Sequence, residues 1–330
     1  MKNIAIIGAG AWGTALAMVA RRAGRNVVLQ AHEPEVVDAV NEACENSLFL
    51  PGVALDPEIR ATNDPAEAAA DADAVLLAVP AQFLRAVLTG FSGNLPSGAP
   101  VVICAKGIEQ GTLALMSEIC EEVVPQAPVA VLSGPTFAAE VALDRPTAVT
   151  LASADKALGV GLSEALGTSR FRIYRSDDIV GAQVGGAVKN VLAIGCGIVE
   201  GRGLGDNAKA ALITRGLAEI VRLGLAKGAK AETLMGLSGI GDLVLTCNAM
   251  QSRNFSLGVA LGQGEALDGI LAARTSVAEG VFSAASVSEL AGSLSIDMPL
   301  SVAVDGILNH FADINATIEG LLARPAGAEQ

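Results

Sequence analysis

The sequence predicts an α/β fold class, in which a doubly wound parallel sheet is followed by an all-α C-terminal domain. Through the first half of the chain, short apolar runs alternate with segments whose apolar residues recur at helical spacing. Continuous apolar strands separated by helices are typical of parallel sheets that helices cover on both faces. Beyond about Asp178 only the helical spacing continues. We therefore expect a first domain over residues 1–180 and an all-helical domain over residues 181–330.

The expected elements follow one another in a regular order. Apolar, largely β-branched runs predict strands near residues 3–8, 26–31, 73–80, 100–107 and 129–136. Helical spacing in the first half covers residues 14–24 and 82–91. In the second half, helices are expected over residues 181–201, 207–228 and 231–247, and again from Phe282 onward. Ligands of doubly wound sheets bind at the carboxyl ends of the strands, so site residues are sought there.

The first predicted strand and helix contain no charged residue between Lys2 and Arg21. A basic start followed by an apolar segment is also the pattern of a signal peptide. Two facts favour a strand, a loop and a helix instead. The helical segment continues through Arg21 and Arg22, and cleavage would remove the first strand of the sheet. We therefore expect a cytoplasmic protein.

Gly8, Gly10 and Gly13 form a G-x-G-x-x-G pattern between the first predicted strand and helix. In this setting the first glycine permits a tight turn, the second lets the backbone approach a pyrophosphate, and the third lets the helix pack on the strand. Amides at the helix N-terminus then donate to phosphate oxygens. The pattern predicts a Rossmann-type domain that binds a dinucleotide; the alternative is a glycine-rich turn without a ligand.

The choice between NADP and NAD depends on the end of the second predicted strand, which reads VVLQAHEPE. NAD-specific sites usually place an acid there, which binds the ribose 2′-hydroxyl. Here Gln30 and Ala31 occupy the expected positions, and His32 can face a 2′-phosphate. Glu33 can bind the ribose or begin the next helix as an acid that suits its N-terminus. The sequence leaves both cofactors, NADP or NAD, open.

Composition argues against several classes of partner. The formal net charge is −13 and no basic run offsets it, so no nucleic acid partner is expected, although a local pocket can still bind a small anion. The five cysteines include no CxxC pair and only two histidines accompany them, so we expect no metal site and buried thiols of a reducing compartment. Beyond the first stretch, no segment of roughly 18 apolar residues escapes a charge or a Gly-Pro interruption, so no membrane span is expected.

Three motifs of the helical half carry polar residues in apolar surroundings. Lys189, in GGAVKNVLAIG, is either buried or at the surface, and Gly185 and Gly186 one turn earlier suit the close approach of another group. Asp242, in GLSGIGDLVLTC, either caps a helix after Gly241 or is buried beside a partner such as a lysine. QSRN places donors at a helix start, where they bind an anion or form an ordinary N-cap: Ser252, Arg253 and Asn254.

Together these motifs resemble the prokaryotic-type NAD(P)-dependent glycerol-3-phosphate dehydrogenases. The resemblance rests on GAGAWGTALA, AKGIE, SGPTFAAEVA, GGAVKNVLAIG with the helix after it, GLSGIGDLVLTC, QSRN and VAEG, in family order over nearly the whole chain. Many dehydrogenases share the glycine fingerprint, whereas the later blocks are specific to this family. The resemblance implies a Rossmann domain, a helical substrate domain and a homodimer. It also implies reversible reduction of dihydroxyacetone phosphate to sn-glycerol 3-phosphate, which supplies glycerophospholipid synthesis.

The resemblance implies roles for individual residues as well. Lys189 is the catalytic proton acceptor, and Lys106 of AKG contacts both substrate and cofactor. The other substrate-binding positions are Gly134, Thr136, Asp242, Ser252, Arg253 and Asn254, together with Lys189 itself. The other cofactor-binding positions are Gly8, Gly10, Ala11, Trp12, Gly13, His32, Ala138, Arg253, Val277 and Glu279. Many members carry serine at position 11 and arginine at position 32, so Ala11 offers only its backbone and His32 is a weaker phosphate partner.

Two other functions fit parts of the sequence. Another Rossmann-plus-helical reductase of 2-keto or 3-hydroxy acids, such as a ketopantoate or hydroxyacyl reductase, shares the fingerprint and a lysine base. It gives no reason for QSRN beside an isolated Asp242. A non-catalytic dinucleotide sensor needs Gly8, Gly10 and Gly13 but not Lys189. Turnover of a panel of hydroxy and keto compounds separates these functions.

Overall fold

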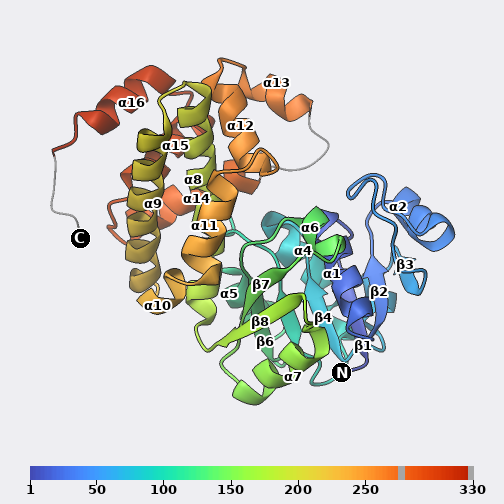
Figure 1. Ribbon diagram of the computed structural model, residues 1–330. Helices are drawn as coiled ribbons and strands as arrows, with labels where there is room; N and C mark the ends of the chain where they lie inside the picture. The colour runs from blue at the N-terminus through green and yellow to red at the C-terminus, as the bar shows by residue number, and fades with distance from the viewer. Residues whose placement is uncertain (274–278, 326–330) are drawn as a thin grey trace. The chain divides into compact units, whose positions relative to one another are not determined.

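The computed structural model describes residues 1–273 and 279–325, and Figure 1 shows its helices and strands. The chain divides into two compact units. The first contains Met1–Lys106 and Ala114–Ala182, and the second contains Gly107–Leu113 and the chain from Gln183 onward. The short segment Gly107–Leu113 therefore belongs to the second unit, although in the sequence it interrupts the first.

The first unit is built on one eight-stranded sheet with the strand order β3-β2-β1-β4-β5-β6-β7-β8. All neighbouring pairs from β3 to β6 are parallel, with Ile4 of β1 opposite both Val27 of β2 and Ala74 of β4. The chain reverses its direction of winding between β1 and β4, which confirms the doubly wound sheet. The strands are β1 Asn3–Ile7, β2 Asn26–Gln30, β3 Ile59–Thr62, β4 Ala74–Leu77, β5 Val101–Ile103, β6 Val129–Ser133, β7 Thr147–Ala152 and β8 Phe171–Ser176.

Helices cover both faces of this sheet because strand residues point alternately into two apolar cores. Ile4 and Ile6 of β1 belong to the core that includes α1, α6 and α7. Ala5 and Ile7 belong to the core that includes α3, α4 and α5. The uncharged N-terminal stretch is therefore a buried strand and the helix that covers it. The helices are α1 Ala11–Arg22, α2 Pro34–Asp38, α3 Pro65–Ala69, α4 Leu84–Phe91, α5 Met116–Val123, α6 Ala138–Ala142 and α7 Lys156–Leu166.

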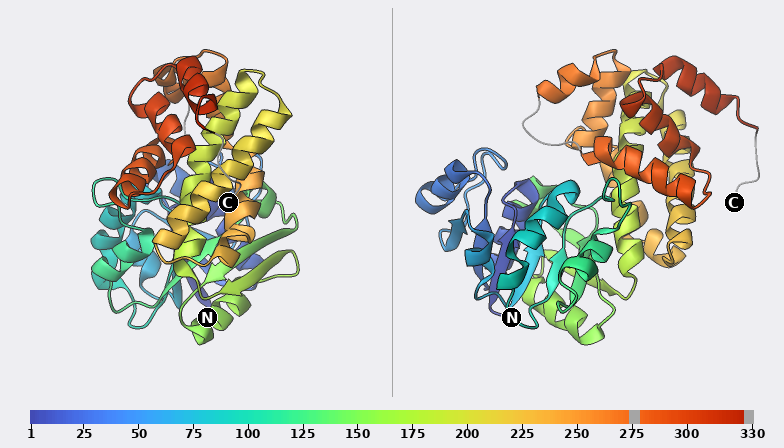
Figure 2. Two further views of the ribbon diagram at one scale, coloured as in Figure 1. Left: turned by 90° about the vertical axis from the view of Figure 1, so that its left-hand side faces the viewer. Right: turned by 180° about the vertical axis from the view of Figure 1, so that it is seen from behind.

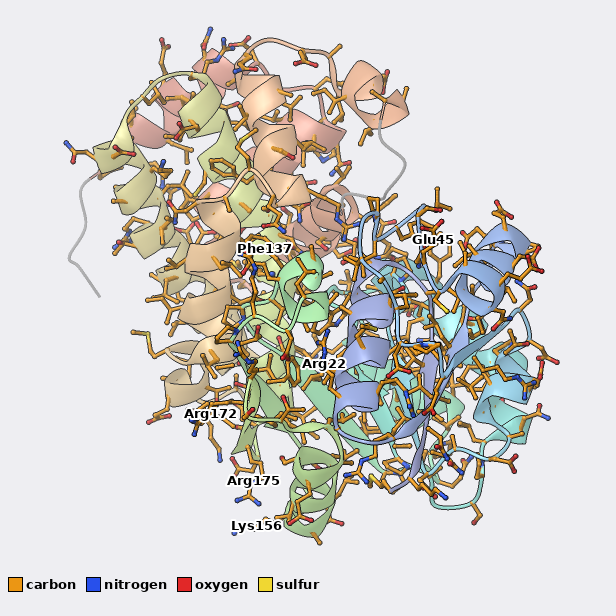
Figure 3. All side chains as sticks on the ribbon, turned by 45° about the vertical axis from the view of Figure 1, so that its right-hand side comes forward. Arg22, Glu45, Phe137, Lys156, Arg172 and Arg175 are labelled. Atoms are coloured by element: carbon orange, nitrogen blue, oxygen red, sulfur yellow. The ribbon has the colours of Figure 1, made fainter. Side chains whose placement is uncertain are left out.

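Three strands were not predicted, and one of them departs from the parallel pattern. β7 pairs antiparallel with β6, with Leu151 opposite Leu132, so the sheet is mostly rather than wholly parallel. β3 has only four residues, and β8 carries exposed charged side chains. Figure 3 shows Arg172 and Arg175 of β8 projecting from the surface. An edge strand keeps polar side chains, so it lacks the apolar run that reveals a buried strand.

From Gln183 onward, every element of regular secondary structure among the described residues is a helix, as the periodicity predicted. α14 and α15 lie side by side in the second unit, as both views of Figure 2 show. A π-helical turn, Leu237–Gly241, comes directly before α11. The helices from the end of the first unit onward are α8 Ile179–Gly201, α9 Asp206–Ala226, α10 Ala231–Leu234, α11 Asp242–Cys247, α12 Arg253–Gly262, α13 Leu267–Ala272, α14 Glu279–Ser293, α15 Pro299–Asn309 and α16 Ile314–Leu322.

By length and composition alone, α8 is the one described helix that could cross a membrane. Its 23 residues include two charged ones, Lys189 and Glu200. The most apolar part of α8 is 89% buried by surrounding protein. That burial is typical of the core helix of a soluble protein, and it places Lys189 in an apolar interior.

Candidate active site

The glycine fingerprint forms the loop between β1 and α1. Gly8 has a φ of +104°, a conformation that other residues rarely adopt. A Cβ on Gly13 would overlap the carbonyl oxygen of Gly8, so the helix can pack on the loop only without a side chain there. A Cβ on Gly10 would meet no atom of the described residues within 4 Å. Packing therefore requires the first and third glycines, and the second leaves the loop accessible at the start of α1.

The start of α1 suits an anionic group. Its N-cap, Gly10, provides no side-chain hydrogen bond, and its first turn contains no acidic residue. Backbone amides and the helix dipole therefore favour a negative charge at this end. The indole Nε1 of Trp12 is buried and has no hydrogen-bond partner within the described part of the chain. A buried donor of this kind can be satisfied by a ligand.

Three predicted residues meet at the carboxyl ends of β5 and β6. The Nζ of Lys106 donates to the carbonyl oxygen of Gly134 at 3.1 Å. The hydroxyl of Thr136 lies 3.3 Å from the same oxygen. Neighbouring parallel strands end at the same edge of a sheet, which is where doubly wound proteins bind ligands. An ammonium and a hydroxyl at this edge suit a small anionic or hydroxylated molecule.

The end of β2 carries the residues that bear on cofactor choice. Gln30 is buried, and its Nε2 donates to the carbonyl oxygen of Asn63 at 3.2 Å. His32 is exposed two residues after the strand ends, and Glu33 is the N-cap residue of α2. The amide of Gln30 is therefore engaged in the fold, whereas the side chain of His32 is accessible to a ligand.

Lys189 and Asp242 form a buried ion pair inside the second unit. The Nζ of Lys189 lies 2.6 Å from Oδ1 of Asp242 and donates to Oγ1 of Thr246 at 2.9 Å. Lys189 is only 6% exposed and Asp242 is fully buried. Thr246 can accept from the lysine because its own hydroxyl donates to the carbonyl oxygen of Asp242 at 2.6 Å. The surface alternative for Lys189 is therefore wrong, as is a simple capping role for Asp242.

Small residues bring these two side chains together. A Cβ on Gly185 would overlap the carbonyl oxygen of Ser238, and a Cβ on Gly239 would overlap that of Leu234. The π-helical turn before Asp242 therefore packs directly on α8, one turn before Lys189. π-helical turns occur frequently at functional sites. The sequence predicted a close approach at Gly185, and the approaching group is the backbone of this turn.

The QSRN motif begins α12. Ser252 is the N-cap, and its Oγ accepts a hydrogen bond from the backbone nitrogen of Phe255 at 3.2 Å. The N-cap alternative therefore holds for Ser252. Arg253 is the first residue of the helix, and its side chain is exposed. Its guanidinium is the group of this motif best placed to reach an anion from solvent.

Asn254 holds three helices of the second unit together. Its Nδ2 donates to Oδ1 of Asn190 on α8 at 3.0 Å, and its Oδ1 accepts from the backbone nitrogen of Gly280 on α14 at 3.1 Å. Asn254 and Asn190 are both buried. Because Asn190 follows Lys189 directly, Asn254 helps to fix the part of α8 that presents the lysine.

The remaining predicted residues lie apart in the chain. Ala11 and Ala138 are the first residues of α1 and α6, and both are half-buried. Glu279 is the first residue of α14 and is also half-buried. Val277 lies outside the described residues.

Sequence reasoning missed three polar residues. Thr246 follows Asp242 by four positions, a spacing that places both on one helix face and could have identified it. Asn190 is adjacent to the predicted Lys189 in the sequence. Asn46 is fully buried beside the glycine loop, and it lies in a segment without any recognised motif. Only tertiary contacts could reveal Asn46.

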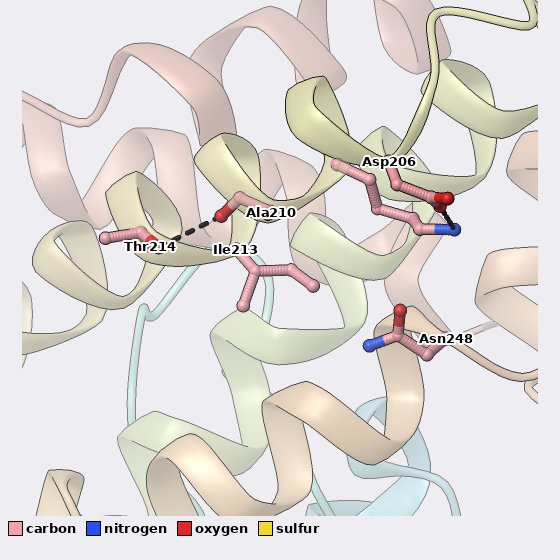
Figure 4. Close-up of a pocket in the computed structure, with 6 residues that line it drawn as sticks. Asp206, Ala210, Ile213, Thr214 and Asn248 are labelled. Carbon is pink, nitrogen blue, oxygen red and sulfur yellow. Dashed lines mark hydrogen bonds and ion pairs between the residues drawn. The ribbon is translucent and has the colours of Figure 1, made fainter.

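A shallow hollow of about 390 Å³ lies at the start of α9, apart from the predicted residues (Figure 4). Lys209 lines it, and its Nζ already pairs with Glu200 at 2.8 Å and Asp206 at 3.2 Å. The two carboxylates raise the pKa of Lys209 and compensate its charge. The hollow is lined by Asp206, Lys209, Ala210, Ile213, Thr214 and Asn248.

The cysteines show no sign of metal or disulfide chemistry. All five are free thiols, and four are buried. Burial raises the pKa of Cys120 to about 12 and raises that of Cys104 as well, so both remain protonated thiols. Within residues 1–273 and 279–325, no group of three His, Cys, Asp or Glu side chains could hold a metal ion.

Relatives of known activity match the whole chain. The glycerol-3-phosphate dehydrogenase (NAD(P)+) of Rhodospirillum rubrum is 62% identical over 327 residues, which cover 99% of this chain and 94% of that protein. The enzyme of the same name from Parvibaculum lavamentivorans is 57% identical over 328 residues, with coverage of 99% and 98%. These identities extend over both the sheet and the helical unit.

Solved structures agree with the sequence relatives. Glycerol-3-phosphate dehydrogenase from Coxiella burnetii superposes with a TM-score of 0.94 at 40% identity, over 98% of this chain and 99% of that chain. A ketopantoate reductase from Ralstonia eutropha reaches a TM-score of 0.61 at 17% identity, over 93% and 97% of the two chains. The second likeness shows a shared fold alone.

The family models divide the chain in the same order as its motifs. Residues 3–159 match the N-terminus of NAD-dependent glycerol-3-phosphate dehydrogenase. Residues 178–319 match the C-terminus of the same family. The resemblance that the motifs predicted is therefore confirmed: the chain belongs to the NAD-dependent glycerol-3-phosphate dehydrogenase family.

Proposed function

We propose that this protein reversibly reduces dihydroxyacetone phosphate to sn-glycerol 3-phosphate with NADPH or NADH, and that Lys189 is its acid and base. The observation that carries the proposal is the buried pair of Lys189 and Asp242, joined at 2.6 Å. A dehydrogenase needs a group that exchanges a proton with the substrate oxygen while the hydride moves. A buried lysine fixed by two partners suits that role.

The glycine loop fits the pyrophosphate of a dinucleotide. Gly10 leaves the loop accessible, and the first turn of α1 carries no acidic residue. The buried indole Nε1 of Trp12 has no hydrogen-bond acceptor within the described residues, so a ligand can accept from it. The bound nicotinamide would supply the hydride that C2 of the substrate receives. We propose that Gly8, Gly10, Ala11, Trp12 and Gly13 hold the cofactor. The same role for His32, Lys106, Ala138, Arg253, Val277 and Glu279 rests on family resemblance.

Lys189 handles the proton of the substrate hydroxyl. In reduction, its Nζ donates a proton to the C2 oxygen as that oxygen gains negative charge. In oxidation, the neutral amine takes the same proton back. Its Nζ donates to Oδ1 of Asp242 and to Oγ1 of Thr246, and these two hydrogen bonds fix the position of the ammonium group. Proton transfer then has a defined geometry.

Asp242 and Thr246 act by holding Lys189. The carboxylate balances the lysine charge in an apolar interior, where an unpaired charge would be costly. The hydroxyl oxygen of Thr246 accepts a hydrogen bond from the lysine, and the same hydroxyl donates to the backbone carbonyl oxygen of Asp242. We propose that this arrangement keeps Nζ in place through the catalytic cycle.

The substrate phosphate is an anion that lies away from the reacting carbon, and a cationic side chain can bind it there. Arg253 is exposed at the start of α12, and arginine binds phosphate through two parallel hydrogen bonds. We propose that Arg253 binds this phosphate and that its binding energy orients the substrate. Substrate contacts of Lys106, Gly134, Thr136, Ser252 and Asn254 remain predictions. Among these residues, Lys106 and Thr136 both hydrogen-bond to the carbonyl oxygen of Gly134.

The cellular role is proposed on family and surface grounds. Free thiols at all five cysteines support a cytoplasmic protein. Large exposed apolar side chains support a homodimer: Val302 is 50% exposed, Phe311 84% and Leu322 81%. The product, sn-glycerol 3-phosphate, would supply glycerophospholipid synthesis.

The direct test is oxidation of NADPH and NADH by the purified protein at fixed dihydroxyacetone phosphate, followed at 340 nm. We expect turnover with both cofactors and little with 2-keto acids. Turnover of ketopantoate or hydroxyacyl compounds alone would favour the other reductase class. Nucleotide binding without turnover of any of these compounds would favour a sensor. The ratio of catalytic efficiencies with the two cofactors also gives the preference that His32 leaves open.

A further inference from the structure

We propose that Asn46 is a positioning residue for the cofactor pyrophosphate: together with Thr14 it fixes the direction in which the Gly10 amide points. Asn46 lies outside every predicted motif, in the segment between the π-helical turn Ala39–Ala43 and β3. The proposal rests on the proposed function only in that a dinucleotide binds at the glycine loop.

Asn46 makes two hydrogen bonds to the loop and the helix that follows it. Its Nδ2 donates to the carbonyl oxygen of Ala9 at 2.8 Å and to Oγ1 of Thr14 at 2.8 Å. The hydroxyl of Thr14 in turn donates to the Ala9 carbonyl oxygen at 3.2 Å. Asn46 and Thr14 are both fully buried. Two donors from different parts of the chain therefore hold one carbonyl oxygen.

The orientation of the Asn46 amide is fixed by its third bond. Its Oδ1 accepts from the backbone nitrogen of Phe49 at 3.1 Å, so Nδ2 must face the glycine loop. The backbone of Asn46 is held as well, because its carbonyl oxygen accepts from Leu50 at 2.8 Å. All polar groups of this side chain are thus used in one arrangement, and such a network is rigid.

The carbonyl of Ala9 and the amide of Gly10 belong to one peptide unit. A trans peptide is planar, and its C=O and N–H bonds point in opposite directions. Holding the carbonyl oxygen toward Asn46 therefore turns the Gly10 N–H away from it. Gly10 has open space where a Cβ would stand, so its backbone can be approached closely. Asn46 and Thr14 thereby preorganise a donor for the pyrophosphate.

Two nearly isosteric variants test this role. Thr14→Val removes the hydroxyl and keeps the volume, and Asn46→Leu removes the amide. Each should raise the Kd for NADH by about tenfold, the equivalent of one directed hydrogen bond. Thr14→Ser keeps the hydroxyl and should restore affinity to within about twofold of the native protein. The double variant should lose less than the product of the two single effects, because both act through the Ala9 carbonyl.

Binding can be read without turnover. Trp12 is the only tryptophan and lies in the first turn of α1, so intrinsic fluorescence reports on the loop directly. NADH and ADP-ribose are titrated in parallel, since ADP-ribose has the pyrophosphate but no nicotinamide. Equal loss of affinity for both ligands is expected and would place the effect at the pyrophosphate.

Asn41 provides the matched control. Its side chain also makes two bonds to backbone, donating to the Ala61 carbonyl oxygen at 3.0 Å and accepting from the Ala61 nitrogen at 2.8 Å. These bonds hold β3 and do not involve the glycine loop. Asn41→Leu should lower the melting temperature without changing the Kd for NADH.

Several results would overturn the proposal. One is an unchanged Kd in the folded Thr14→Val variant, and another is an equal loss of affinity in Asn41→Leu, since both would indicate a merely structural role. Loss of NADH affinity with normal ADP-ribose affinity would also contradict it. Normal nucleotide binding without reduction of dihydroxyacetone phosphate would refute the proposed function and leave the positioning role of Asn46 standing.

Discussion

Lys189 and Asp242 are 53 positions apart in the sequence, and their side chains meet at 2.6 Å in the apolar interior of the second unit. The contact depends on backbone packing as much as on charge. Gly185 lets the turn before Asp242 lie directly on α8, and Gly239 lets that turn fold against Leu234. Thr246 completes the arrangement by accepting from the lysine. The candidate base is therefore fixed from two sides.

Replacing Lys189 by methionine should abolish proton transfer. We expect kcat to fall by about 10²–10⁴-fold, the usual contribution of a general acid or base. The variant should also be less stable by about 3–5 kcal/mol, because it breaks the buried ion pair of Lys189 and Asp242. Stopped-flow oxidation of NADPH and chemical denaturation measure the two effects.

A double variant separates chemistry from folding. Lys189→Met combined with Asp242→Leu removes both charges, so stability should return toward that of the native protein while turnover stays low. Substantial turnover in either variant, with NADPH still bound, would refute the assignment of Lys189 as acid and base.

Gly185→Ala should disturb the site without touching either charged residue. The new Cβ would overlap the carbonyl oxygen of Ser238, so the π-helical turn must move and carry Asp242 with it. Overpacking of this kind costs about 1–3 kcal/mol. We expect a lower kcat with an unchanged Kd for NADH, measured by single-turnover kinetics and by Trp12 fluorescence.

Gly292 is the matched control for Gly185. It also lies on a helix of the second unit, and a Cβ there would meet no described atom within 4 Å. Gly292→Ala should leave kcat unchanged and stabilise α14 by up to about 1 kcal/mol. If both variants lower kcat alike, the effect does not come from the contact with Ser238.

Arg253→Ala should discriminate between phosphorylated and unphosphorylated substrates. We expect kcat/KM for dihydroxyacetone phosphate to fall by about 10–100-fold, the value of hydrogen bonds to a charged group. With NADPH kept saturating, so that the cofactor role expected for Arg253 does not enter, activity with dihydroxyacetone should change little. Arg253→Lys keeps the charge but not the paired geometry, so it should be intermediate. Equal losses with both substrates would show that Arg253 does not bind the phosphate.

Glu219 gives the second unit a distinctive dependence on pH. Its carboxylate accepts from the backbone nitrogens of Leu300 and Ser301 at 2.6 and 3.0 Å, and thereby caps α15. Burial raises the pKa of Glu219, and these hydrogen bonds offset only part of that rise. The Glu219 carboxyl group therefore holds its proton more tightly in the folded protein than in the unfolded chain. Rising pH removes that proton and so reduces the contribution of Glu219 to stability.

The measurement is the free energy of unfolding of the native protein minus that of Glu219→Gln, from about pH 4 upward. Other titrating groups cancel in this difference. It should decrease as the pH rises from the ordinary pKa of glutamate through the raised value in the fold. A difference that grows with pH would mean that the hydrogen bonds from Leu300 and Ser301 outweigh burial.

Much of the fold was predictable because its signals are local. Apolar runs and helical spacing revealed the doubly wound sheet and the helical unit, and the glycine spacing revealed the loop before α1. β8 was missed because an edge strand does not need an apolar run. Arg172 and Arg175 interrupt the apolar pattern by which a buried strand is recognised. The antiparallel pairing of β7 depends on the path of the chain, which periodicity does not encode.

Residue types and their spacing were enough to indicate the candidate chemistry: a dinucleotide loop, a lysine in an apolar helix, an isolated aspartate and an arginine at a helix start. Which of these groups meet depends on how the chain packs. That packing paired Lys189 with Asp242 and added Thr246, gave Ser252 and Asn254 structural roles in the second unit, and placed Asn46 against the glycine loop. Residue type and spacing are properties of the chain, whereas contacts between distant residues arise from how its helices and strands pack.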